Sequence, residues 1–188
     1  MLKTIRNILL LSTAIVLTAC NAEEMINRDY LCRFSLDTQL HPGSNLEAAV
    51  GGVGTFVWVT YSRENGIGCF HVHSYNSSEE ETILLTTAEE NMISYNLGAY
   101  NGIFIGSTNF NGPWAYDRQC PNCLSETGLM KYPLTWVNKQ PMKVECANCK
   151  RVYSLETGAS ETGGLRLMTY YVSYYVAGGM SSKITAYN

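Results

Sequence analysis

The chain has 188 residues, of which 46% are hydrophobic and 15% charged, and its formal net charge is −3. Charged residues make up about 25% of an average soluble protein, so this composition excludes a disordered tail and a coiled coil. The acidic balance offers no basic stripe, which excludes nucleic acid as a partner. Thirteen Tyr and 16 Gly favour β-structure, because aromatic side chains suit strands and glycine suits tight turns.

Residues 1–19 have the pattern of a secretory signal peptide. Two basic residues precede the apolar stretch Ile8–Leu17, which is too short to span a membrane. The segment ends on Leu17-Thr18-Ala19-Cys20, which resembles the lipobox of bacterial lipoproteins. In that family the cysteine receives diacylglycerol and becomes the new N-terminus, which implies lipidation at Cys20. An ordinary secretory signal that contains a cysteine is the alternative.

Residues 20–28 are predicted to be a lipidated tether that anchors the chain to a membrane of the bacterial cell envelope. No Asp follows Cys20 directly, so the usual signal for retention in the inner membrane is missing. This favours the outer membrane. The acidic pair Glu23-Glu24 resembles the surface-export tag of some Gram-negative lipoproteins, and a short solvated tether is the alternative interpretation.

Residues 29–188 are predicted to form a single β-domain. Ser44-Asn45-Leu46-Glu47 has the form of a capping box and predicts one short helix that ends at Gly51-Gly52. Strand candidates then follow, separated by clusters of Asn, Gly and Ser, as in an antiparallel sandwich or barrel. They are Thr55–Tyr61, Gly68–Tyr75, Thr82–Thr87, Met92–Leu97, Gly102–Gly106, Trp114–Asp117, Met142–Glu145, Leu165–Tyr171, Val172–Val176 and Lys183–Tyr187.

The strongest chemical signal is a pair of C-x2-C motifs with 22 residues between them, formed by Cys120, Cys123, Cys146 and Cys149. Two thiolates three residues apart can point at one ion from a tight turn, and a second such turn completes a tetrahedron. Soft thiolates select zinc or iron–sulfur chemistry, so zinc is the predicted cofactor and a [2Fe-2S] cluster is the alternative. Disulfides are the third alternative in an oxidising compartment. A redox motif of the thioredoxin type would begin a helix after a strand in a βαβ unit, whereas the surroundings here are β and Gly-rich.

The residues around both motifs resemble the Rieske family of iron–sulfur proteins. The first run is Trp114-Ala115-Tyr116-Asp117-Arg118-Gln119-Cys120-Pro121-Asn122, and the second is Cys146-Ala147-Asn148-Cys149-Lys150-Arg151-Val152-Tyr153-Ser154-Leu155-Glu156-Thr157-Gly158. They are similar to that family's two cluster-binding loops, and the resemblance covers about residues 102–176. It implies an antiparallel Rieske-like β-sandwich or barrel.

The departure from the Rieske pattern falls on the ligands. A Rieske centre takes one Cys and one His from each loop, and here the His positions are occupied by Asn122 and Cys149. Cysteine ligands would also lower the potential of a [2Fe-2S] cluster, from about −150 to +300 mV towards about −400 mV. The resemblance therefore implies the fold without the Rieske redox centre, and a structural zinc ion fits the residues better.

Cys32 and Cys69 remain, and an oxidising compartment favours a disulfide between them. A metal site at Cys69, His71 and His73 is an alternative, since alternate strand residues share a face. Two exposed histidines are the simplest interpretation of that strand.

The sequence contains no nucleophile elbow, zinc-protease motif or phosphate-binding loop, so nothing in it supports an enzyme. We expect a non-catalytic lipoprotein whose Rieske-like domain binds an envelope partner or ligand. An electron carrier with a Cys-ligated [2Fe-2S] cluster is the alternative.

Overall fold

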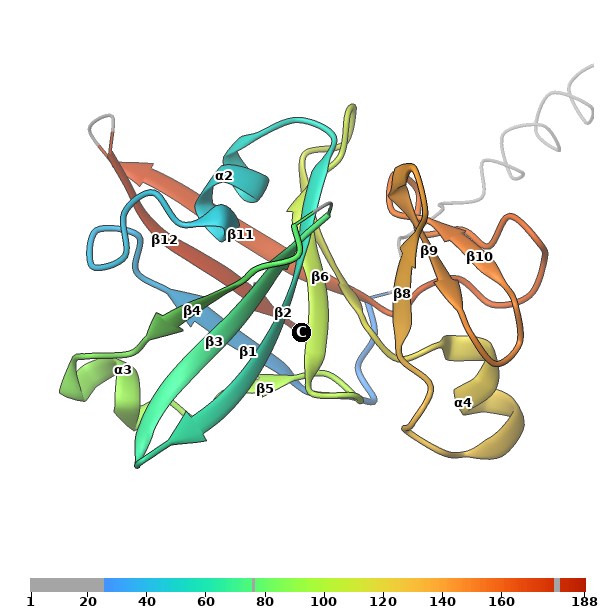
Figure 1. The fold of residues 1–188 in the computed structure, drawn as a ribbon, viewed down its shortest axis with the longest axis horizontal. Helices are drawn as coiled ribbons and strands as arrows, with labels where there is room; N and C mark the ends of the chain where they lie inside the picture. Colours follow the sequence, from blue (N-terminus) through green and yellow to red (C-terminus); the bar gives the residue numbers. More distant parts are fainter. Residues whose placement is uncertain (1–25, 76, 178–179) are drawn as a thin grey trace, which may run out of the picture.

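Antiparallel β-strands are the main secondary structure of the molecule, as a computed structural model shows for residues 26–75, 77–177 and 180–188 (Figure 1). The strands form one sheet of nine and one sheet of three, and the prediction of a mostly antiparallel β-fold is confirmed. The predicted signal peptide, Cys20 and residues 21–25 of the predicted tether lie outside the described residues.

The order along the large sheet is not the order along the chain. From edge to edge it runs β4 (Glu80–Leu84), β3 (Ile67–Ser74), β2 (Thr55–Glu64), β6 (Gly102–Ser107), β7 (Pro113–Asp117), β11 (Thr169–Ala177), β12 (Met180–Tyr187), β1 (Cys32–Leu36) and β5 (Asn96–Leu97). The small sheet consists of β10 (Val152–Ser154), β9 (Gln140–Cys146) and β8 (Leu134–Val137). Since β8, β9 and β10 lie between β7 and β11 in the chain, the small sheet is an insertion into the large one.

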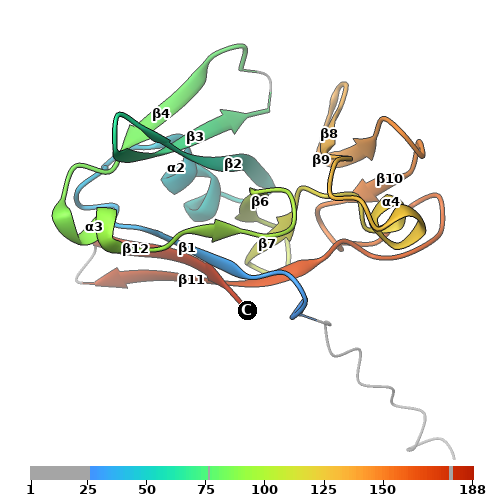
Figure 2. The same ribbon diagram turned by 90° about the horizontal axis from the view of Figure 1, so that it is seen from below.

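The large sheet curls so that its two ends pack against each other. In Figure 2, β2, β3 and β4 lie above β1, β11 and β12. The rings of Phe34 on β1 and Phe70 on β3 are 4.8 Å apart between centroids, which joins the two ends through their side chains. Both belong to the main core, to which the helix α2 (Asn45–Gly51) adds Leu46, Ala49 and Val50. This core contains none of the four cysteines of the C-x2-C motifs.

A second core lies on the other face of the large sheet. Phe56, Trp58 and Phe104 from β2 and β6 pack there with side chains of the small sheet. The indole rings of Trp58 and Trp136 stack with an interplanar angle of 9° and a centroid separation of 6.3 Å. This second core also contains the cysteines, so the small sheet and the large sheet meet around them.

The predicted helix is confirmed as α2, which begins after the N-cap Ser44 and ends before Gly52. The Ser44 hydroxyl accepts the hydrogen bond of the Glu47 backbone N–H at 3.2 Å. The expectation of a single helix is wrong, because the described residues also contain α3 (Ala88–Met92) and α4 (Pro121–Thr127). Helix α3 has a reciprocal capping box between Thr87 and Glu90.

Two predicted strands are corrected in part. Within Met92–Leu97 only the last two residues are a strand, because the capped helix α3 extends to Met92. Within Leu165–Tyr171 the strand begins at Thr169, because the preceding residues bond to the inserted small unit. The backbone N–H of Leu165 donates to Asn122 Oδ1 at 3.0 Å, and that of Leu167 to the Gly158 carbonyl at 2.8 Å. The short strands β8 and β10 were not predicted.

The helices in the described part of the chain are all too short to cross a lipid bilayer.

Candidate metal centre

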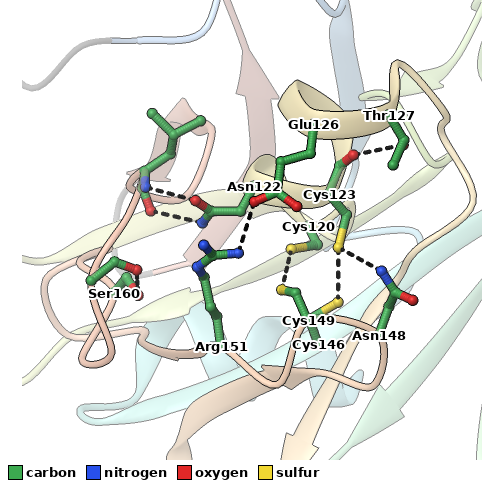
Figure 3. A network of polar contacts seen from close by, with 12 residues as sticks. Cys120, Asn122, Cys123, Glu126, Thr127, Cys146, Asn148, Cys149, Arg151 and Ser160 are labelled. Atoms are coloured by element: carbon green, nitrogen blue, oxygen red, sulfur yellow. Dashed lines mark hydrogen bonds and ion pairs between the residues drawn. The ribbon is translucent and has the colours of Figure 1, made fainter.

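Four cysteines from two separate loops meet in the second core (Figure 3). Cys120 is the N-cap of α4, and Cys123 lies in its first turn. Cys146 ends β9, and Cys149 lies in the turn that follows. The four Sγ atoms all lie within 4.8 Å of one another, so these residues can hold one metal ion.

The shortest Sγ–Sγ contacts join one loop to the other. Cys120 and Cys149 are 3.6 Å apart, and so are Cys123 and Cys146. A disulfide would need about 2.05 Å, and the described cysteines are all free thiols. Four sulfurs placed about 2.3 Å from a central zinc ion are about 3.8 Å apart. The observed spacing is therefore compatible with four thiolates around one metal ion, and it is too long for disulfide bonds.

The first loop is shaped by the start and the end of α4. Pro121 occupies the first helical turn, where its missing N–H is not needed, and Gly128 ends the helix in the left-handed conformation with φ of 68°. The Leu124 N–H donates to the Cys120 carbonyl at 3.0 Å, and the Thr127 hydroxyl donates to the Cys123 carbonyl at 2.7 Å. This turn holds both thiols of the first motif on one side of the helix.

The second loop is a tight turn after β9. The Lys150 N–H donates to the Cys146 carbonyl at 2.9 Å, and the Cys146 N–H donates to the Arg151 carbonyl at 3.0 Å. Lys150 has a positive φ of 59°, which reverses the chain direction and leaves Cys149 beside Cys120. An ion pair at 3.1 Å between Arg151 and Glu126 of α4 fastens this turn to the first loop.

Burial makes two of the thiols poor acids without a cation. It raises the pKa of Cys120 and of Cys123, even though each sulfur has a hydrogen-bonding neighbour. The Tyr153 hydroxyl lies 3.3 Å from Cys120 Sγ, and the Asn148 side-chain amide donates to Cys123 Sγ at 3.3 Å. A buried thiolate needs compensating positive charge, and a divalent ion at the centre would supply it to all four.

Cys149 differs from Cys120 and Cys123 in the direction of its pKa shift. Partial burial opposes its ionisation, but hydrogen bonds from the backbone N–H and the guanidinium of Arg151 lower the pKa of Cys149 to about 7. A thiolate is therefore present at this position near neutral pH. Cys149 is also only partly buried, so an ion can meet this ligand first.

Asn122, which the sequence resemblance aligns with the first histidine of the Rieske pattern, does not join the four sulfurs. Its side-chain amide donates to the Tyr153 hydroxyl at 2.7 Å, and its Oδ1 accepts from the Leu165 N–H at 3.0 Å. A Cβ on Gly164 would lie 2.3 Å from that oxygen, so only glycine fits beside it. Asn122 thus binds the first loop to β10 and to the segment before β11.

The redox alternative for the first C-x2-C fails on two points. Cys120 does begin a helix after a strand, as a thioredoxin-type motif would. However, the next strand is β8, which belongs to an antiparallel sheet, so there is no βαβ unit. The pKa of Cys120 is raised by burial, whereas a redox-active cysteine needs a lowered pKa.

The predicted disulfide between Cys32 and Cys69 is not formed, and both thiols are free. Cys32 lies in the main core with Phe34. Along β3, Phe70 and Val72 also face that core, so Cys69 faces the opposite side of the sheet by strand alternation. The two sulfurs are thus on opposite faces of the sheet, which the sequence pattern did not reveal.

The three histidines lie away from the four cysteines and pair with carboxylates. His41 Nε2 is 2.7 Å from Glu90, while His71 and His73 both contact Glu80. Sequence reasoning identified the four cysteines but missed the roles of Asn148, Arg151 and Tyr153, which hydrogen-bond to the sulfurs. Of these, Tyr153 occupies an aromatic position of the Rieske pattern, which was the available signal.

None of the known family models, curated proteins or solved structures matches this chain.

Asp117 fixes the chain just before the first loop, and its ionisation gives a testable pH dependence. Its Oδ1 accepts from the Gln119 N–H at 2.7 Å, and its Oδ2 accepts from the Ala99 N–H at 2.6 Å and the Tyr170 hydroxyl at 2.7 Å. Burial raises the pKa of Asp117 to about 6, against hydrogen bonds that lower it. In the unfolded chain the carboxyl returns to its ordinary value near 3.8.

We expect the free energy of unfolding to fall as the pH rises from about 4 to about 6. Between these values Asp117 is protonated in the folded protein and ionised in the unfolded chain. The stabilisation from the bound proton is therefore complete below the pKa of the unfolded chain and is lost as the pH rises through the pKa of the folded protein. The difference between the pKa of Asp117 in the folded protein and in the unfolded chain corresponds to about 3 kcal/mol of unfolding free energy. Urea denaturation across this range should show a steeper fall for wild type than for Asp117→Asn. The exposed Asp29→Asn variant is the control, and equal slopes for all three proteins would contradict the prediction.

Proposed function

We propose that this protein is a lipid-anchored protein of the bacterial cell envelope whose Rieske-like unit is held together by one structural zinc ion. The ligands are the thiolates of Cys120, Cys123, Cys146 and Cys149. The role is non-catalytic, in binding an envelope partner or ligand. The observation that carries the proposal is the approach of all four Sγ atoms to within 4.8 Å of one another.

This spacing favours a single ion over a two-iron cluster. In a [2Fe-2S] cluster each pair of thiolates binds a different iron, and the two irons separate the pairs. Here no such gap separates two pairs of thiols, because all four Sγ atoms lie within 4.8 Å of one another. Zinc has no redox chemistry, so at this centre it would supply a cross-link and positive charge.

The surroundings of the site support a structural role. The cysteines are part of the second core, where they pack with Leu134, Val144 and Tyr153 of the small sheet. An ion there would fix the first loop to the second and hold the small sheet against the outer face of β2 and β6. The Rieske-like assignment is supported by the order of the loops, with Asn122 and Cys149 in the two histidine positions.

Elemental analysis and visible absorption of the purified full chain test this proposal. We expect the protein to contain zinc whose binding requires the four cysteines, and we expect the protein to be colourless. A coloured protein with iron and sulfide would instead support the electron-carrier alternative. Four oxidised thiols without metal, found by mass spectrometry, would refute a metal centre of either kind.

A further inference from the structure

A second group of metal-type ligands lies on the outer face of β2 and β3, away from the four cysteines. Cys69 and His71 alternate along β3 with the core residues Phe70 and Val72, so both face outward. Ser62 on β2 is the direct cross-strand neighbour of Cys69. Glu64 follows two positions along β2, on the same face, just before the turn that joins the two strands.

The three ligand atoms have the spacing of a metal site. The Sγ of Cys69, Nε2 of His71 and a carboxylate oxygen of Glu64 all lie within 4.8 Å of one another. Sγ is 3.7 Å from Nε2, and Nε2 is 3.6 Å from Glu64 Oε1. Around a tetrahedral zinc ion the corresponding edges are about 3.5 Å and about 3.3 Å. These two edges therefore differ by a few tenths of an ångström from those of a ligand set for one ion.

Glu80 on β4 keeps the proton of His71 on Nδ1, which leaves Nε2 free to bind a metal ion. Its Oε1 is 2.6 Å from His71 Nδ1, and its Oε2 is 2.7 Å from His73 Nε2. A carboxylate can only accept, so Nδ1 carries the hydrogen and the lone pair of Nε2 faces Cys69 and Ser62. Metal-binding histidines are usually oriented in this way, by a carboxylate on the other ring nitrogen.

We propose that Cys69, His71 and Glu64 bind a second zinc ion, with Glu80 as the positioning residue for His71. Three protein ligands leave the fourth position of a tetrahedral ion to water, as in zinc sites that are open to solvent. The Ser62 hydroxyl lies 2.8 Å from His71 Nε2 and 3.1 Å from Cys69 Sγ, so it borders that position.

The exposure of the three ligands increases from Cys69 through His71 to Glu64, as in a site that solvent can reach from one side. Cys69 is fully buried and the His71 side chain is 17% exposed, whereas the Glu64 side chain is 57% exposed. An ion can therefore enter from the Glu64 side and reach the thiol. The sulfur ligand favours zinc over magnesium or calcium, which prefer oxygen ligands.

Zinc stoichiometry after equilibrium dialysis of the full chain at a buffered free zinc concentration tests the second site. We expect two zinc ions in wild type and one in Cys69→Ser or His71→Gln. Glu64→Gln changes an exposed side chain, so it preserves the fold while weakening the second site at least tenfold. Glu80→Gln should weaken it about 10–100-fold through the orientation of His71.

His73→Gln is the matched control, because His73 shares Glu80 and the same sheet face but is not a proposed ligand; it should retain both ions. In Cys146→Ser the ion of the four-cysteine centre is lost while the His71-dependent ion remains, so failure of one site is distinguishable from failure of the other. Zinc binding that is unchanged in Cys69→Ser, His71→Gln and Glu64→Gln would overturn the proposal. The proposal would also be overturned if a fluorophosphonate labelled Ser62 in a His71-dependent way while zinc binding did not depend on His71. That result would indicate that Ser62 is a nucleophile activated by His71 and Glu80.

Discussion

Replacing Cys146 with serine is expected to abolish zinc binding at the four-cysteine centre. Cys146 is fully buried at the end of β9, and its sulfur is 3.6 Å from that of Cys123. The variant leaves three sulfurs and an open position inside a packed core. Because metal binding requires the folded arrangement of both loops, its free energy also stabilises those loops.

The loss should be local rather than global. Structural zinc in small zinc domains contributes about 10–16 kcal/mol, but this protein also has a main core that contains none of the four cysteines. We therefore expect Cys146→Ser to retain the far-ultraviolet spectrum of a β-protein and to melt at a lower temperature. Limited proteolysis should cut it within Leu124–Val144, the segment that the metal closes.

The control for this experiment removes a thiol elsewhere. Cys32→Ala alters a buried cysteine of the main core, so the zinc of the four-cysteine centre should remain. Wild type treated with a strong chelator should show the same protease sensitivity as Cys146→Ser. Retention of zinc by Cys146→Ser with the affinity of wild type would rule out Cys146 as a ligand.

Replacing Cys20 with alanine is expected to move the protein from the membrane fraction to the soluble fraction. The prediction rests on the segment Leu17-Thr18-Ala19-Cys20, whose resemblance to the lipobox implies that Cys20 is the acylated residue. Each buried methylene contributes about 0.8 kcal/mol, so several acyl chains on one residue give a stable anchor. Without the thiol no acyl chain can be attached, and the effect should be almost complete.

Detergent phase partitioning and membrane fractionation measure this change. Asn21→Ala is the matched control, since it alters the tether next to the acylated position and leaves the thiol intact; it should stay in the membrane fraction. If Cys20→Ala partitioned into detergent to the same extent as wild type, the lipid anchor would have to be abandoned.

The features that depend on neighbouring residues were predictable from the sequence alone. Short aromatic segments between glycine-rich turns indicated antiparallel strands, because strand formation follows alternation and turn chemistry along the chain. Ser44 and Glu47 marked the start of α2 for the same reason. The two C-x2-C motifs identified four ligands, since three-residue spacing brings each pair of thiols to one side of a turn.

Helix α4 shows where local signals were present but were not interpreted as a helix. Pro121 near its start and Gly128 just after its end are the usual signals of a helix. The first C-x2-C motif was predicted to be only a tight turn.

Only the tertiary structure decided which distant residues meet. It set Cys120 against Cys149 and Cys123 against Cys146, because the turn of α4 and the turn after β9 approach from opposite sides. It separated Cys32 from Cys69, since strand alternation places one in the main core and the other on the outer face. It also brought Glu64 and Glu80 to Cys69 and His71 through the register of β2, β3 and β4. A register shift of one residue would move these side chains to the opposite face, and register is set by packing across strands, which no single segment of sequence contains.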